Sequence, residues 1–378
     1  MTPAARTRTA IELLDAILAS QAGADTVIAN GFKARRYAGS KDRRAVRELI
    51  YRAIRRFGDP PASGRAAMAA LADADDVLAA TFDGSAYGPA ALLPDEPRAT
   101  GGVMPAWLAA RLPDEASLDR APLDLRVNRL KATRDEVSPL FPDATPVGSD
   151  GLRLTDPINV EASDAYRDGR IEVQDFGSQL IVEACAAAPA TIVVDLCAGA
   201  GGKTLALAAA MRNEGRLIAC DTARDRLRRL EPRAQRAGAE CEVRLLDGGR
   251  EAEQLADLEG LADVVLIDAP CSGTGTLRRN PEARWRLTPE RVEALVVLQR
   301  HVIDLALPLV KPGGALVYAV CSQLREEGAA QVEALLAREA GWSAAPLPFG
   351  TADGPGIRLS PQRDGTDGFF VARLIKAC

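Results

Sequence analysis

The stretch TIVVDLCAGAGGKT, residues 191–204, decides the fold class of this chain. It passes from an apolar strand pattern through a glycine-rich turn into a helical pattern. Glycines allow the backbone to approach a ligand closely, and the N-terminus of the following helix offers free N–H groups to an anionic group. This order of strand, glycine turn and helix therefore predicts an α/β domain with a ligand at the turn.

From residue 167 to residue 378 the sequence alternates between strand and helix patterns. Such alternation predicts a parallel sheet with helices on both faces, and we assign these residues to one domain. The expected strands are 191–198, 216–221, 241–247, 262–270, 315–321 and 369–376. The expected helices between them are 203–211, 223–237, 289–307 and 325–340.

Residues 1–122 show helix patterns and no strand pattern, so we expect an all-α domain there, followed by a small α/β connector over residues 123–166. Residues 1–60 contain twelve Lys and Arg against six Asp and Glu. This asymmetry suggests a polyanionic partner, although a solvated helix face gives the same pattern. The helix pattern 40–58 carries its basic residues on the face away from its apolar stripe. They are Arg43, Arg44, Arg47, Arg55 and Arg56.

The length and composition of the chain limit the classes of protein to which it can belong. Its 378 residues are enough for two or three domains, and its net charge is −5. It contains no run of eighteen apolar residues, so no membrane span is expected. Its seven cysteines form no CxxC pair and are odd in number. That pattern argues against zinc, any other metal site and a disulfide framework, and it favours a reducing cytoplasm. We expect a monomer.

Three kinds of ligand site compete for the glycine turn. The dinucleotide fingerprint G-x-G-x-x-G is half met, because Gly199 and Gly201 fit but Thr204 stands where the third glycine belongs. A phosphate-binding P-loop needs glycine five positions before Gly202, and that position is Cys197. The third kind is an adenosylmethionine loop, in which an acid ends the first strand and the turn wraps the amino-acid part of the cofactor.

Acids end four successive expected strands. The carboxyl ends of parallel strands form the edge where open α/β sheets bind ligands. Asp221 is placed to accept from both ribose hydroxyls, and Asp247 from the adenine amino group. A single acid at a strand end is as often a helix N-cap as a cofactor-binding group. Four acids beside a glycine turn favour a cofactor that contains a nucleoside, and a dinucleotide cofactor is still possible on this pattern alone. The four acids are Asp195, Asp221, Asp247 and Asp268.

Two cysteines, Cys271 and Cys321, follow strands at the same edge, and their spacing predicts that the thiols lie close together. Two thiols and a carboxyl group beside a methyl donor suit methylation of carbon 5 of cytosine. A thiolate that adds at carbon 6 makes carbon 5 nucleophilic, and a protonated carboxyl group at ring nitrogen 3 stabilises the adduct. After methyl transfer the first thiol must leave carbon 6, and the second thiol can assist that release. The lone histidine, His301, falls within an expected helix, so catalysis by histidine is not expected.

Several sequence blocks carry a resemblance to a known family. In chain order they are RIEVQDFGSQL, DLCAGAGGKT, DAPCSGTGTLRRNPEARW, GGALVYAVCS and DGFFVARL. Together they resemble the RNA cytosine-C5 methyltransferases, and among these the bacterial small-subunit rRNA branch called RsmB, Sun or Fmu. The N-terminal region resembles the helical RNA-binding domain shared with the antitermination factor NusB, and PLDLRVNRL resembles the family's connector motif.

The resemblance implies a Rossmann-like class I methyltransferase domain with a mostly parallel seven-stranded sheet, S-adenosyl-L-methionine as cofactor and small-subunit rRNA as substrate. It makes Cys321 the nucleophile, Cys271 the residue that assists release, and Asp268 a catalytic group that faces the cytosine. It also implies RNA contacts for Arg126 and Asn128. The cofactor residues that it implies are Cys197, Ala198, Gly199, Ala200, Gly201, Gly202, Lys203, Asp221, Asp247 and Asp268.

The chain departs from the family pattern in two places. The family loop reads CAAPGGK where this chain has Gly199 and Ala200, and the second cysteine follows threonine where this chain has Val320. Small residues keep the shape of the loop, whereas valine removes a hydroxyl beside the cysteine. Two other functions stay open. One is a DNA cytosine-C5 methyltransferase with Cys271 as nucleophile, and the other is a catalytically silent RNA-binding or ribosome-assembly protein.

Overall fold

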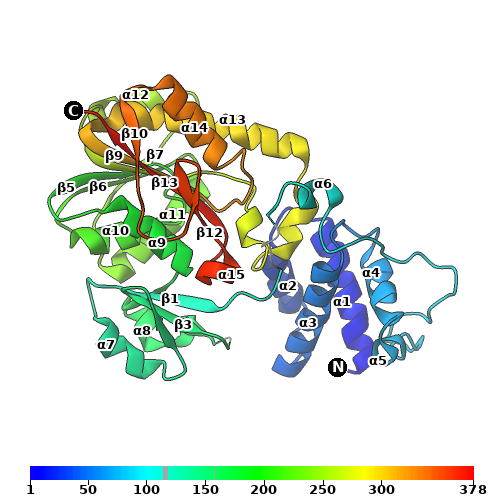
Figure 1. The fold of residues 1–378 in the computed structure, drawn as a ribbon. Helices are drawn as coiled ribbons and strands as arrows, with labels where there is room; N and C mark the ends of the chain where they lie inside the picture. The colour runs from blue at the N-terminus through cyan, green and yellow to red at the C-terminus, as the bar shows by residue number, and fades with distance from the viewer. Residues whose placement is uncertain (114–117, 157) are drawn as a thin grey trace. The chain divides into compact units, whose positions relative to one another are not determined.

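The computed structural model describes residues 1–113, 118–156 and 158–378. Their contacts divide the chain into two units. One unit joins Met1–Leu112 with Leu277–Thr288, and the other joins Pro113–Thr276 with Pro289–Cys378. In Figure 1 the first unit contains helices, and the second contains sheets covered by helices. The first unit therefore ends before the expected boundary at residue 122, and it takes in a segment from much later in the chain.

The first unit is built on α1 (Pro3–Leu18), which packs against α3 (Ser40–Arg56). Leu14 and Ile54 are fully buried in its core, as the apolar stripes of both helices predict. No described residue before Leu123 lies in a strand, which agrees with the sequence patterns. A likeness of this unit to NusB stays a prediction. Its other helices are α2 (Ala24–Lys33), α4 (Gly64–Ala72), α5 (Asp76–Ala79) and α6 (Ala106–Ala109).

The segment Leu277–Thr288 belongs to the helical unit because its polar side chains satisfy backbone groups there. The Arg284 guanidinium donates to the carbonyl oxygens of Ile54 at 2.5 Å and Phe57 at 3.0 Å. The indole N–H of Trp285 also donates to the carbonyl oxygen of Phe57, at 2.8 Å. These carbonyls lie at the end of α3, where a helix has no backbone donors left for them. The sequence patterns had assigned this segment to the C-terminal domain, whereas its contacts group it with the helical unit.

The connector is a four-stranded antiparallel sheet in the order β2-β3-β1-β4. Leu125, Leu152 and Ile171 are fully buried in its core. Because β4 pairs with β1, the connector extends past the expected boundary at residue 166. Its elements are β1 (Leu123–Val127), α7 (Arg134–Val137), β2 (Thr145–Val147), β3 (Gly151–Leu154), α8 (Asp164–Arg167) and β4 (Ile171–Val173).

The larger sheet has nine strands in the order β11-β12-β13-β9-β8-β5-β6-β7, with β10 paired to β13. Five neighbouring strands, β7, β6, β5, β8 and β9, are parallel, and the remaining strands pair antiparallel. This corrects the expected seven-stranded sheet, because β10, β11 and β12 are short and lack the apolar runs that predict buried strands. The strands are β5 (Thr191–Asp195), β6 (Gly215–Asp221), β7 (Glu242–Leu245), β8 (Ala262–Asp268), β9 (Val310–Val320), β10 (Trp342–Ala345), β11 (Thr351–Asp353), β12 (Gly356–Leu359) and β13 (Phe369–Lys376).

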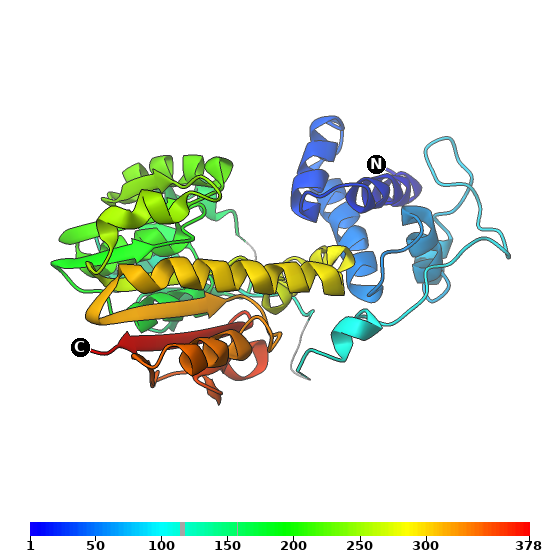
Figure 2. The ribbon, with the colours of Figure 1, turned by 90° about the horizontal axis from the view of Figure 1, so that it is seen from above.

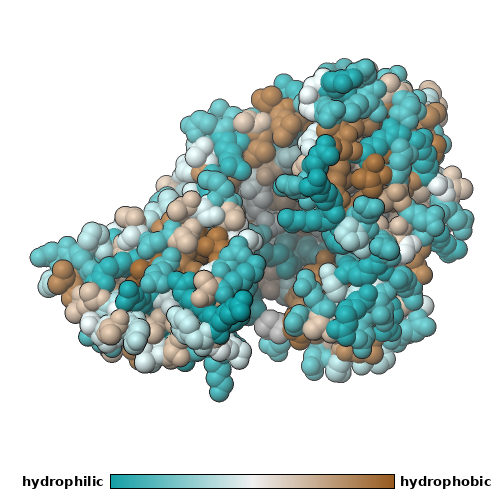
Figure 3. Space-filling model, turned by 180° about the vertical axis from the view of Figure 1, so that it is seen from behind, coloured by the Kyte–Doolittle hydropathy of each residue, from teal (hydrophilic) through white to brown (hydrophobic). Residues whose placement is uncertain are grey.

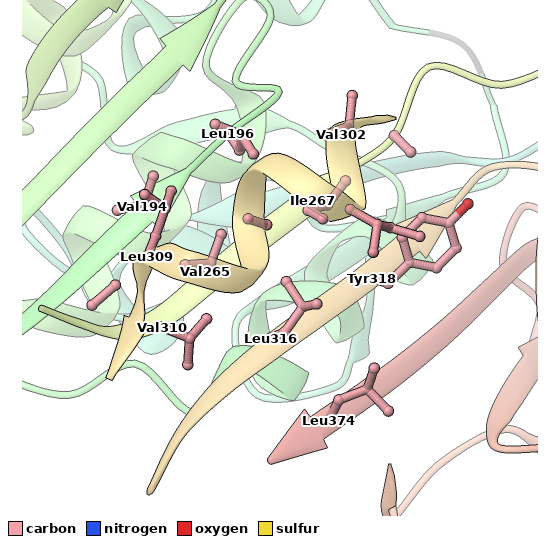
Figure 4. Packing of buried hydrophobic residues seen from close by; sticks show 14 of the residues in the cluster. Val194, Leu196, Val265, Ile267, Val302, Leu309, Val310, Leu316, Tyr318 and Leu374 are labelled. Carbon is pink, nitrogen blue, oxygen red and sulfur yellow. The ribbon is translucent and has the colours of Figure 1, made fainter. Parts of the chain in front are cut away.

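Helices cover both faces of this sheet, as the alternating pattern predicts. On one face Val194 and Leu316 pack with Val302 of α13, which runs along β8 and β9 (Figures 2 and 4). Val193 and Val317 are the chain neighbours of Val194 and Leu316, so their side chains point to the opposite face, where they pack against α9 and α10. The helices are α9 (Phe176–Cys185), α10 (Gly202–Met211), α11 (Arg224–Ala237), α12 (Glu251–Leu255), α13 (Pro289–Ala306), α14 (Ala329–Arg338) and α15 (Pro361–Asp364).

The carboxyl ends of the parallel strands lie along one edge of the sheet. β5, β6 and β8 end at Asp195, Asp221 and Asp268, and β9 ends one residue before Cys321. Among the described residues, no helix is long and apolar enough to cross a membrane. The face drawn in Figure 3 mixes hydrophilic side chains with scattered apolar ones.

Candidate active site

The two expected cysteines lie side by side. The sulfur atoms of Cys271 and Cys321 are 3.3 Å apart. Parallel pairing of β8 with β9 places Asp268 beside Ala319, so the turns that follow both strands start at the same level of the sheet. The backbone N–H of Gly275 donates to the carbonyl oxygen of Cys321 at 3.0 Å, which ties the two turns together. The expected closeness of the thiols is therefore confirmed.

The pKa of the Cys271 thiol is raised above its usual value. The hydrogen bond with Cys321 is the main cause, and burial adds to it. This thiol therefore stays protonated at neutral pH in the described arrangement. Cys197, at the start of the glycine turn, also has a raised thiol pKa, in its case because of burial.

A lysine–carboxylate pair stands beside the thiols. The Lys203 ammonium nitrogen lies 2.6 Å from Asp268 Oδ2. Burial alone would lower the pKa of Lys203, but Asp268, through its charge and its hydrogen bond, and then Cys321 raise the pKa above its usual value. Lys203 thus stays charged at the end of β8, at the same edge as the thiols. Its position in the sequence had suggested a cofactor contact alone.

The glycine turn has the backbone shape that its sequence predicts. Gly199 and Gly201 have φ angles of +55° and +86°, in the left-handed region that favours glycine. A Cβ atom on Gly201 would also lie 2.2 Å from Leu230 Cδ1. A Cβ on Gly199 would have nothing within 4 Å, so this side of the turn is open.

The carboxylate of Asp221 is fixed against this turn. Its Oδ2 accepts from the backbone N–H of Gly199 at 2.8 Å, and its Oδ1 accepts from the backbone N–H of Ala223 at 2.7 Å. The remaining lone pairs of both oxygens suit hydroxyl donors such as those of a ribose. The open glycine turn, the N-terminus of α10 and this carboxylate together fit the amino-acid part and the nucleoside part of adenosylmethionine.

The other two strand-end acids lie in different surroundings. Asp195 is fully buried, accepts from Thr204 Oγ1 at 2.7 Å, and anchors the start of α10. Burial raises its pKa to about 7. Asp247 lies two residues beyond the end of β7 and is exposed, and its Oδ2 accepts from Gln254 Nε2 at 3.3 Å. An adenine contact by Asp247 stays a prediction.

The five expected RNA-binding arginines all lie on α3. The side chain of Arg44 is 81% exposed and pairs with Glu48, and Arg47 pairs with Asp25 at 2.8 Å. The guanidinium groups of Arg47 and Arg55 both stack over the Tyr51 ring, at 5.4 and 5.2 Å from its centroid. These contacts hold basic groups on one helix without burying them.

The RNA contacts expected for Arg126 and Asn128 stay a prediction, and both side chains are buried, at 4% and 1% exposure. Asn128 Nδ2 donates to the carbonyl oxygens of Gly169 at 2.8 Å and Ala237 at 2.7 Å. Arg126 Nε donates to the side chain of Gln174 at 2.6 Å. Both residues therefore brace the connector against the elements around the glycine turn.

A buried polar cluster, which the sequence patterns did not predict, directly follows both cysteines. It centres on Glu327, which is fully buried, and includes the hydroxyl groups of Ser272, Thr274 and Ser322. The acids in the sequence after Cys321 were its only signal. Among the described residues no group of three His, Cys, Asp or Glu side chains gathers closely enough to hold a metal ion.

Comparison with known proteins gives one consistent result. Residues 183–375 match the family described as 16S rRNA methyltransferase RsmB/F. The ribosomal RNA small subunit methyltransferases B of Salmonella arizonae and Erwinia tasmaniensis are 38% and 36% identical over 288 residues. Each match covers 72% of this chain and 66% of the relative, so the chain spans just under two thirds of these relatives.

Solved structures share the fold. The crystal structure of PH0851 aligns with 100% of this chain and 99% of its own, with a TM-score of 0.80 and 25% identity. A methyltransferase homologue from Pyrococcus horikoshii aligns with 68% of this chain and 87% of its own, with a TM-score of 0.60 and 29% identity. NSun6 from Pyrococcus horikoshii, solved with SFG, aligns with 72% of this chain and 95% of its own at 20% identity and a TM-score of 0.63, which supports the fold alone.

Proposed function

The chain belongs to the RsmB/F family of 16S rRNA methyltransferases, and from this premise we propose that it methylates carbon 5 of a cytidine in small-subunit rRNA. The observation that carries this proposal is the pair of sulfurs 3.3 Å apart beside the Lys203–Asp268 pair. Adenosylmethionine, held by the turn Cys197–Lys203 and by Asp221, supplies an electrophilic methyl group when bound.

Cys321 is the attacking group in this proposal. Its thiolate forms a bond to carbon 6 of the cytosine, and the electron pair of the C5–C6 double bond becomes available at carbon 5. Cys271 stays protonated beside it, because the contact with Cys321 and burial raise the pKa of Cys271. After methylation, water takes the proton from carbon 5, the electron pair of that C–H bond re-forms the C5–C6 double bond, and the C6–S bond breaks with its electron pair left on the Cys321 sulfur. The protonated Cys271 thiol assists this departure by donating a hydrogen bond to that sulfur.

Asp268 and Lys203 stabilise the charge that develops on the ring. Attack at carbon 6 moves electron density toward ring nitrogen 3, and a donor positioned there lowers the barrier. Asp268 faces the cytosine, and a proton carried by this pair, whose heavy atoms are 2.6 Å apart, is the donor. A preorganised donor of this kind costs no reorganisation when the reaction occurs.

The helical unit binds RNA phosphate through α3 in this proposal, in the manner of a NusB-like domain. Arginines on one helix, two of them stacked over the Tyr51 ring, supply the positive charge. We further propose that the protein acts as a monomer in the cytoplasm, with no membrane attachment and no metal.

Labelled adenosylmethionine tests this function directly. The protein is incubated with small-subunit rRNA that lacks the modification, with DNA as the parallel substrate, and the nucleosides are identified by mass spectrometry. We expect label in 5-methylcytidine of the RNA. Label in DNA alone would favour a DNA methyltransferase, and binding of rRNA without any transfer would favour a silent assembly protein.

A further inference from the structure

Glu327 lies in the turn between Cys321 and α14, and its side chain has no exposed surface. An ionisable side chain is rarely fully buried unless its oxygens are paired. Both Glu327 oxygens here accept hydrogen bonds from the turns that carry the two cysteines.

One set of bonds reaches the turn that contains Cys271. The backbone N–H of Ser272 donates to Glu327 Oε1 at 2.8 Å, and the hydroxyl of Ser272 donates to Oε2 at 2.5 Å. Gln299 Nε2 of α13 donates to Oε1 at 3.0 Å and to the carbonyl oxygen of Pro270 at 2.9 Å. Ser272, which follows Cys271, therefore binds the Glu327 carboxylate directly, and Pro270, which precedes Cys271, is linked to it through Gln299.

A second set reaches the turn that contains Cys321. The hydroxyl of Ser322 donates to Glu327 Oε2 at 2.5 Å and lies 3.0 Å from Thr274 Oγ1. The phenol of Tyr318, on β9 three residues before Cys321, donates to the carbonyl oxygen of Glu327 at 2.6 Å. A single side chain thus links the neighbours of both thiols.

We propose that Glu327 is a positioning residue that holds the Cys271 and Cys321 thiols together. The inference deepens the proposed function, because attack and release at one cytosine require both sulfurs near the same ring carbon. Reacting groups must be held to within about 0.5 Å by packing and hydrogen bonds behind them. Hydrogen bonds to the residue that follows each thiol supply that constraint.

The first measurement does not depend on methyl transfer. Dibromobimane joins two close thiols, with loss of one bromide for each new C–S bond, and peptide mass spectrometry identifies the Cys271–Cys321 cross-link. Glu327→Gln keeps the shape of the side chain but replaces one acceptor oxygen by a donor. We expect it to cross-link this pair at least tenfold more slowly than the wild-type protein. The same cross-linking rate in both proteins would overturn the inference.

The second measurement is kinetic. With rRNA and adenosylmethionine, Glu327→Gln is expected to lower kcat at least tenfold while KM for adenosylmethionine stays unchanged, because its partners lie away from the glycine turn. Glu333→Gln is the matched control, since Glu333 pairs with Arg325 at the surface, and it should retain wild-type values. A rise in KM with unchanged kcat would contradict a positioning role.

Ser322→Ala covers the case in which Glu327→Gln does not fold. It removes one donor to Glu327 and should slow the cross-link and kcat in the same direction, by a smaller factor. A wild-type protein that cross-links quickly but methylates no RNA would refute the proposed function and leave this inference standing. Unchanged cross-linking and kcat in a folded Ser322→Ala protein would count against it.

Discussion

At the scale of single residues, the sulfurs of Cys271 and Cys321 are close enough for either to reach the same ring carbon. Replacing one thiol at a time separates attack from release. In Cys271→Ala, we expect Cys321 to attack and the adduct to persist, because the group that assists its departure is missing. The covalent protein–RNA complex should appear as a band that survives denaturing electrophoresis.

Cys321→Ala should form no adduct and transfer no methyl group. Cys185 is a suitable control because it is a buried core residue, and Cys185→Ala should cost stability through a small cavity without trapping RNA. A trapped complex in Cys321→Ala and none in Cys271→Ala would reverse the assignment, as a DNA-type mechanism predicts.

Asp195 gives a pH-dependent prediction at the same scale. Burial raises its pKa from the ordinary value of 3.8 to about 7, so the folded chain keeps this proton at a pH where the unfolded chain has lost it. The free energy of unfolding therefore falls as the pH rises from about 4 to about 7. Asp195→Asn cannot titrate, so relative to the wild-type protein we expect it to gain stability between pH ~5 and pH ~8. Urea unfolding of both proteins at these two pH values measures the effect. The same difference in free energy of unfolding between variant and wild type at both pH values would refute the prediction.

At the scale of secondary structure, long apolar strands and amphipathic helices were predictable from the sequence. The five parallel strands and three of the helices between them, α10, α11 and α13, follow from residue periodicity, and acids at strand ends located the candidate site. The strands β10 to β12 were missed because each has only three or four residues, too few to show a strand pattern. The place of Arg284 was missed because its partners, Ile54 and Phe57, lie more than two hundred residues away in the chain.

The basic face of α3 leads to a prediction for the whole helix. Each phosphate contact releases counterions, so the logarithm of RNA affinity falls with the logarithm of salt concentration by about 0.7–0.9 per contact. The triple variant Arg43→Ala, Arg44→Ala and Arg47→Ala should bind rRNA more weakly and with a flatter salt slope. Affinity for adenosylmethionine should not change. Filter binding over a salt series gives the slope.

Arg8→Ala on α1 removes one exposed arginine from the same unit and serves as the control. Its slope should match that of the wild-type protein. An unchanged slope in the triple variant would mean that the face is merely solvated.

At the scale of the whole molecule, neither unit is one continuous piece of chain. The chain leaves the second unit after Thr276, contributes Leu277–Thr288 to the helical unit, and returns at Pro289. Cys271 lies only six residues before Leu277, where this segment begins. Removing the N-terminal residues would therefore remove the groups to which Leu277–Thr288 hydrogen-bonds. For this reason an N-terminal truncation is a poor test of RNA binding. The substitutions on α3 avoid that difficulty.

The segment Leu277–Thr288 is expected to stabilise the helical unit even when it is supplied as a separate peptide. Glu282 accepts from the backbone N–H of Ala24 at 2.7 Å, at the start of α2, and Arg284 donates to carbonyls at the end of α3. An acid at a helix N-terminus and a base at a helix C-terminus both oppose the helix dipole favourably. A synthetic peptide of residues 277–288 should therefore raise the Tm of a fragment of residues 1–112. The same peptide with Arg284→Ala should raise it less, because the carbonyl oxygens of Ile54 and Phe57 lose their donor. Thermal unfolding by circular dichroism measures both shifts. Equal shifts from the two peptides, or none from either, would show that the hydrogen bonds of Arg284 do not hold this segment in the helical unit.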